Sequence, residues 1–118
     1  MNRLMVSVAA VLALTIGCAC AAGVLSEQQA RAMAISILKG DPYGKTSAEV
    51  AGNIQQIQFI QDGNTEACGA QETLRVWEFH VVVVTENEDL FDNGIIDGYL
   101  ALDARTGDIV CTNLPLLD

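Results

Sequence analysis

Few side chains of this sequence are suited to catalysis. His80 is the only histidine, and a base–nucleophile pair would place it beside a serine, threonine or cysteine. It follows Glu78 by two residues and precedes a run of valines, which is typical of a histidine in a β-strand. The sequence contains no glycine-rich phosphate loop, H-E-x-x-H or G-x-S-x-G motif. We therefore predict no catalytic residues and a protein that is not an enzyme.

The four cysteines divide into two pairs. Cys18 and Cys20 lie in an apolar N-terminal stretch, whereas Cys68 and Cys111 lie in the remainder of the chain. If the N-terminal stretch is removed on export, Cys68 and Cys111 form an even pair in an oxidising compartment, where a disulfide is the expected state. The spacing of the four cysteines does not match a zinc site, so we predict no metal and no cofactor.

An acidic segment, ENEDLFDNGIID over residues 86–97, is rich in oxygen ligands. With Gly94 at the sixth position of an EF-hand loop, Phe91 falls where calcium coordination needs Asp or Asn. The spacing therefore does not predict a calcium site.

The same acidic segment contains bulky apolar residues, which is unusual for a polar connection. An apolar anchor ringed by carboxylates is typical of a protein-binding loop. In the alternative interpretation these side chains fold back and cap the core. The candidates for contact with a partner are Leu90, Phe91, Asp92, Ile95 and Ile96.

Residues 1–22 have the order of regions found in a secretory signal peptide. Arg3 is their only charge, and an uncharged run over residues 4–16 precedes a group of small residues. This run is shorter than the about 20 residues that span a membrane. Cleavage near Ala22 would leave a single domain over residues 23–118 that is periplasmic or secreted and has no membrane span.

A second interpretation of the leader is a lipoprotein signal. The run Thr15-Ile16-Gly17-Cys18 resembles a lipobox, with Thr15 where leucine is usual. Processing at Cys18 would anchor the chain through a lipid and leave Cys20 unpaired, whereas conventional cleavage leaves only an even pair. The cysteine count favours conventional cleavage, and the alternative is a small membrane-anchored lipoprotein that binds a ligand or a metal.

The charge of the chain narrows the choice of partners. Beyond the leader, five basic residues stand against all fifteen acidic ones, which gives a formal net charge of −10. Such a chain repels phosphate backbones and anionic lipid, so neither nucleic acid nor a membrane surface is an expected partner. A basic protein is a possible partner, and the alternative is that acidity only keeps an exported protein in solution.

An amphipathic helix is predicted to begin after Ser26 and to end before Gly40. Ser26 is an N-cap candidate, and Gln29 can complete a capping box. Apolar residues then recur at helical spacing as far as Leu38, and Gly40 supplies the stop. The next residues form a connection with a helical turn at residues 47–51.

Strands are predicted over residues 54–61 and 74–86, with a hairpin over residues 99–112. Residues 65–73 are expected to form a loop that the disulfide would pin. One helix followed by three or four antiparallel strands predicts a two-layer α+β domain. The face of the long strand expected to meet the helix carries Trp77, Phe79, Val81 and Val83.

The helix LSEQQARAMAISIL, the strand WEFHVVVV and the hairpin YLALDARTGDIV together resemble the PepSY domain. In that family a helix packs on an antiparallel sheet that closes with a hairpin of this form. Asp103, Thr106, Gly107 and Asp108 occupy the hairpin positions. Their chemistry predicts a structural turn, in which Asp103 accepts hydrogen bonds from backbone N–H groups and Gly107 takes a positive φ.

The resemblance implies a protein-binding module near the cell surface that inhibits or regulates a peptidase. The acidic segment and a neighbouring sheet edge would then contact the partner. The Cys68/Cys111 pair and the acidic segment itself depart from many members of the family. A second hypothesis is an envelope immunity protein that neutralises a basic toxin.

Overall fold

The structure, a computed structural model, describes residues 23–70, 75–86 and 91–117. The predicted leader with its lipobox cysteine, Cys18, and Leu90 of the acidic segment lie outside these residues. The elements in chain order are α1 (Glu27–Leu38), α2 (Ser47–Asn53), β2 (Ile54–Ile60), β3 (Asn64–Thr65), β4 (Gly69–Ala70), β5 (Val76–Val84), the 3-10 turn η2 (Asp92–Gly94), β6 (Ile95–Asp103) and β7 (Ile109–Thr112).

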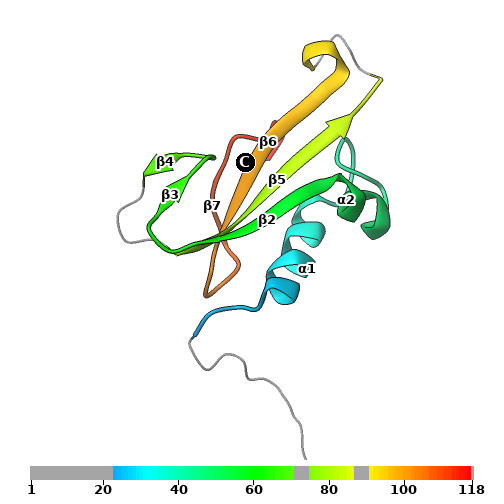
Figure 1. Ribbon diagram of the computed structural model, residues 1–118. Coiled ribbons are helices and arrows are strands. Elements are labelled where there is room, and N and C mark those ends of the chain that lie inside the picture. Colours follow the sequence, from blue (N-terminus) through cyan, green and yellow to red (C-terminus); the bar gives the residue numbers. More distant parts are fainter. Residues whose placement is uncertain (1–22, 71–74, 87–90, 118) are drawn as a thin grey trace, which may run out of the picture.

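The predicted α+β class is confirmed, with a second helix. Four antiparallel strands form one sheet in the order β2-β5-β6-β7, and β3 pairs with β4 as a separate small hairpin (Figure 1). α1 and α2 pack on one face of the sheet, which we call the inner face. The opposite face is the outer face.

Both helices begin with a capping box. The Ser26 hydroxyl accepts a hydrogen bond from the Gln29 N–H, and the Gln29 side chain accepts one from the Ser26 N–H. Thr46 and Glu49 repeat this arrangement at the start of α2. The predicted start of α1 after Ser26 and its end before Gly40 are confirmed, and the helical turn expected at residues 47–51 is part of the seven-residue α2.

The inner face holds the apolar core. Phe79 and Leu100 are fully buried beneath Ala30 and Ala34 of α1, whose small side chains let the helix approach the sheet closely. Trp77 is partly buried against this core, and its Nε1–H donates to the Leu25 carbonyl at 3.0 Å. The prediction that this face of β5 meets the helix is therefore confirmed.

Tyr43 connects two segments that are distant in sequence. The residue lies between the two helices, is 2% exposed and donates a hydrogen bond from its hydroxyl to the Pro115 carbonyl. Burial raises the pKa of Tyr43 to about 12, because the ionised phenolate would lose its hydration. The folded protein therefore favours the neutral form of the Tyr43 hydroxyl.

Two predicted boundaries were wrong. β6 begins at Ile95 rather than at residue 99, because β5 and β6 pair continuously from Val76↔Asp103 to Val84↔Ile95. Ile95 and Ile96 therefore lie in a strand and not in the acidic connection. The segment after residue 64, expected to be a loop, contains the short strands β3 and β4.

Candidate partner-binding surface

The outer face of the sheet divides into a covered half and an open half. Neighbouring residues of a strand point to opposite faces, so β5 directs Phe79 inward and both Glu78 and His80 outward. The β3–β4 hairpin lies over the half around Glu78. From His80 to Val84 at the end of β5, the outward side chains are partly or fully exposed.

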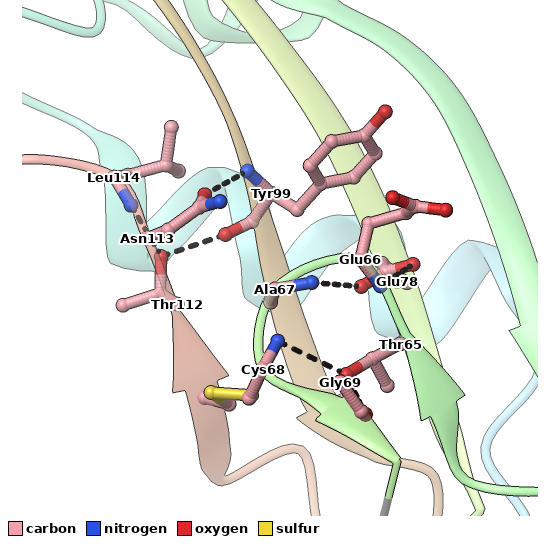
Figure 2. Close-up of a disulfide and its surroundings, with 11 residues drawn as sticks. Thr65, Glu66, Ala67, Cys68, Gly69, Glu78, Tyr99, Thr112, Asn113 and Leu114 are labelled. Atoms are coloured by element: carbon pink, nitrogen blue, oxygen red, sulfur yellow. Dashed lines mark hydrogen bonds between the residues drawn. A yellow bond between two sulfur atoms is a disulfide. The ribbon is translucent and has the colours of Figure 1, made fainter.

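The covered half is fastened by a disulfide and a buried carboxylate (Figure 2). Cys68, between β3 and β4, is bonded to Cys111 of β7 with a Cα–Cα distance of 6.1 Å, which confirms the predicted disulfide. Glu78 is only 3% exposed, and its two carboxylate oxygens accept hydrogen bonds from the N–H groups of Glu66 and Ala67 at 3.2 and 3.0 Å. Charge-assisted bonds of this kind compensate for burial of the carboxylate.

Thr65 orders the turn of the hairpin from inside. Its hydroxyl accepts a hydrogen bond from the Cys68 N–H at 3.2 Å and donates one to the Gly69 carbonyl at 3.0 Å. The side chain is 6% exposed, so both bonds are largely shielded from water. These hydrogen bonds therefore fix the backbone at Cys68 independently of the disulfide.

The open half centres on His80. Its Nε2 lies 2.7 Å from Asp97 Oδ1, and its ring stacks on Tyr99 with a centroid distance of 4.6 Å and an interplanar angle of 13°. The register of β5 and β6 explains why these three side chains meet. His80 pairs directly with Tyr99, and Asp97 is the diagonal neighbour of His80. Neither contact supplies a serine, threonine or cysteine nucleophile, so this group offers hydrogen bonds, charge and ring surface to a ligand.

Negative charge dominates around Tyr99. The pKa of the Tyr99 phenol lies above its ordinary value because of desolvation first, followed by the charges of Glu66, Asp97 and Glu78. These carboxylates come from different elements and act on the same phenol. The outer face therefore presents an aromatic pair in an anionic environment, which suits a cationic group better than an anionic one.

The end of the open half is apolar. Val84 and Ile95 pair directly across β5 and β6, and they are 79% and 44% exposed. Val82, also on this face, is half-buried. Two apolar side chains exposed side by side next to Asp97, which is 60% exposed, form a small anchor beside a carboxylate.

A hollow lies where the covered half meets the edge of the sheet. It has a volume of about 360 Å³ and is open to solvent. Asp62, Glu66 and Glu78 contribute carboxylates, and none of the described lining residues is basic. The other lining residues are Gln58, Phe59, Ile60, Gln61 and Asn64.

The predicted contact residues of the acidic segment lie in different environments. Phe91 is half-buried and packs against the main core, and Ile96 is 3% exposed within it, as in the alternative in which the segment caps the core. Ile95 points to the outer face and is exposed. Asp92 begins η2. Of the candidates in the described part of the chain, Ile95 is thus the apolar side chain accessible to a partner.

The predicted turn residues form a tight hairpin between β6 and β7. Asp103 Oδ1 accepts hydrogen bonds from the N–H groups of Arg105 and Thr106 at 2.8 and 3.3 Å. Gly107 has φ +80°, and a Cβ there would meet the thioether end of the Met33 side chain of α1. The positive φ is the reason for glycine at this position, because the end of the exposed Met33 side chain could move aside for a Cβ.

Sequence reasoning missed three features of this surface: the buried Glu78, the His80–Asp97–Tyr99 group and the hollow beside β2. The alternation of β5 directs Glu78 to the face opposite Phe79, but only the β3–β4 hairpin buries its side chain. The other two depend on strand register and on the path of the chain after β2, which no local motif encodes.

Within the described residues, neither helix has the length and apolar character needed to cross a membrane. The same residues contain no group of three or more His, Cys, Asp or Glu side chains placed to hold a metal ion. Comparison of the chain with family models, curated proteins and solved structures gives no match.

Proposed function

We propose that this protein is an exported PepSY-like module that binds a protein partner and inhibits a peptidase of the cell envelope. The observation that carries the proposal is the exposed pair Val84 and Ile95 beside Asp97 on the open half of the outer face. Apolar anchors next to polar groups are typical centres of protein interfaces.

Two further properties support the proposal. The fold, with α1 packed on an antiparallel sheet that closes in the Asp103–Asp108 hairpin, is the arrangement that the PepSY resemblance implies. The Cys68–Cys111 disulfide is the expected state of cysteines outside the cytoplasm, where a peptidase of the envelope would be met.

The test is capture followed by inhibition. The tagged protein, exported through its own leader, is incubated with envelope extract under oxidising conditions, and captured proteins are identified by mass spectrometry. We expect a peptidase in stoichiometric amount that untagged protein displaces and whose activity falls when the purified protein is added. Recovery of a basic toxin would replace peptidase inhibition by toxin neutralisation, and recovery of no partner would contradict the proposal.

A double variant, Val84→Ser with Ile95→Ser, identifies the contact surface. Loss of both anchors is expected to weaken capture at least tenfold, because central apolar contacts carry most of an interface's binding energy. Leu116→Ser is the matched control, since Leu116 is 74% exposed and its neighbours Pro115 and Leu117 contact Tyr43 and the core of the inner face. Equal capture by the double variant and the control would remove the anchor from the proposal.

A further inference from the structure

We propose that the free edge of β2 binds an extended segment of the partner as an added strand, with one basic side chain of that segment entering the hollow beside Glu66. The inference rests on the proposed function, because it assumes a protein partner, and it names the chemistry by which that partner is recognised. Addition of a strand to an exposed sheet edge is a common mode of peptide recognition.

The edge itself is the first observation. β2 is the outermost strand of the sheet and pairs only with β5. Among the described residues, no hydrogen bond other than those to β5 involves the backbone of Gln55–Ile60. The register shift lies between Ile54 and Gln56, so Gln56–Ile60 is a regular stretch on which a partner strand can pair.

The side chains of β2 leave this edge unprotected. Natural edge strands are commonly blocked by lysine, proline or other charged residues. The sequence of β2, IQQIQFI, contains no charged residue and no proline. The opposite edge, β7, has only four residues and is followed closely by Pro115. The longer and less protected edge is therefore β2.

The hollow defines what the added strand should carry. Side chains of a strand alternate between faces, so every second residue of an added segment would point toward the outer face beside Gln58. There it meets a hollow of about 360 Å³ whose charged lining residues, Asp62, Glu66 and Glu78, are all acidic. A lysine or arginine side chain is long enough to reach from the edge into this hollow and complements its charge.

The acidic lining of the hollow favours a segment of another protein over a second copy of this chain. Pairing of β2 with β2 of another copy would place neutral glutamine and apolar side chains at the acidic hollow. It would also bring together two chains that each carry a formal net charge of −9. A basic segment of another protein satisfies the hollow, whereas a second copy does not.

The experiment is selection from a displayed library of random nonapeptides on the full exported protein. We expect enriched peptides with alternating β-branched residues and Lys or Arg at one fixed position. The most enriched peptide, made synthetically, should bind at least tenfold more weakly when its alternate backbone nitrogens are methylated, because methylation removes the N–H donors of strand pairing. Enrichment without a basic position, or binding unaffected by methylation, would overturn the inference.

Variants of the protein locate the site. Asp62→Asn with Glu66→Gln should weaken binding of the selected peptide at least tenfold, whereas Asp41→Asn with Asp108→Asn, which removes two exposed charges elsewhere, should leave it unchanged. Equal effects of the two pairs would overturn the inference, as would a concentration-dependent dimer that Gln58→Lys abolishes. Capture of a peptidase that is unaffected by Asp62→Asn with Glu66→Gln would overturn the edge site and leave the proposed function standing. Failure to capture a peptidase would instead contradict the proposed function.

Discussion

The inner face of the sheet is covered by two helices over the main apolar core, whereas the outer face is covered only in part, by the small β3–β4 hairpin. On the inner face, side chains such as Phe79 and Leu100 are fully buried beneath α1 and α2. On the outer face, the β3–β4 hairpin is held by the Cys68–Cys111 disulfide and by the carboxylate of Glu78. Ala67 of the hairpin also packs against the small buried cluster of Ile60, Val76 and Ala101 on this face. The position of the hairpin therefore depends on these specific bonds together with a small apolar contact.

This difference separates stability from binding. Substitutions on the inner face are expected to lower the free energy of unfolding. Substitutions under the hairpin are expected to lower it less. Substitutions on the open half and at the β2 edge are expected to act on binding alone.

Phe79→Ala should have the largest effect on stability. Removal of a fully buried aromatic side chain leaves a cavity beneath α1, and the free energy of unfolding should fall by about 3–5 kcal/mol in urea titrations. Val84→Ala, on the exposed end of the same strand, is the control and should change stability by less than about 0.5 kcal/mol. Similar losses in both variants would contradict the assignment of the inner face as the core.

Replacement of both Cys68 and Cys111 by serine should lower the free energy of unfolding by about 2–4 kcal/mol. The bond closes a loop with a sequence separation of 43 residues and so restricts the unfolded chain. Wild-type protein measured in a reducing agent is the control and should show the same loss. A loss seen in the variant but not in the reduced wild type would assign the effect to the serines rather than to the bond.

Glu78→Gln should cost about 1–3 kcal/mol. The amide keeps one acceptor but places an NH₂ group against a backbone N–H of the hairpin, which leaves a buried donor without a partner. Glu66→Gln, at an exposed neighbouring position, should change stability by less than about 0.5 kcal/mol. If the two variants unfold at the same urea concentration, Glu78 does not fasten the hairpin.

Tyr43 predicts a small alkaline dependence of stability. Its folded pKa of about 12 exceeds the ordinary value of 10.0, so between these two pH values the unfolded chain loses a proton that the folded protein retains. Stability is fully present below about pH 10 and should fall by up to about 1.4 kcal/mol per pH unit above it. Tyr43→Phe should remove this contribution from the slope, and an identical slope in the variant would contradict it.

Much of the fold follows from local sequence signals. The Ser26 capping box and the apolar spacing after it define α1, and the alternation of β5 identifies Phe79 as inward-facing. The class of fold and the disulfide were also predicted correctly. These features depend on residues close in sequence or, for the cysteines, on their number and on the export that the leader predicts.

The candidate surface could be predicted less well, because it depends on register and on packing between distant segments. The segment before Ile95 looks polar, yet pairing with β5 extends β6 through it and turns Ile96 into the core. Asp97 meets His80 only because the strands pair with Tyr99 opposite His80. Glu78 is buried only because the hairpin after β2 turns back over the sheet.

Hydrogen–deuterium exchange of the protein, alone and with a partner recovered by capture, tests the proposed binding surface directly. Strand addition at the edge and contact at the anchor predict new protection of backbone amides in Gln55–Ile60 and around Ile95, with little change in α1 and α2. Protection concentrated on the helices, with Gln55–Ile60 unchanged, would contradict the claim that the outer face and its β2 edge form the binding surface.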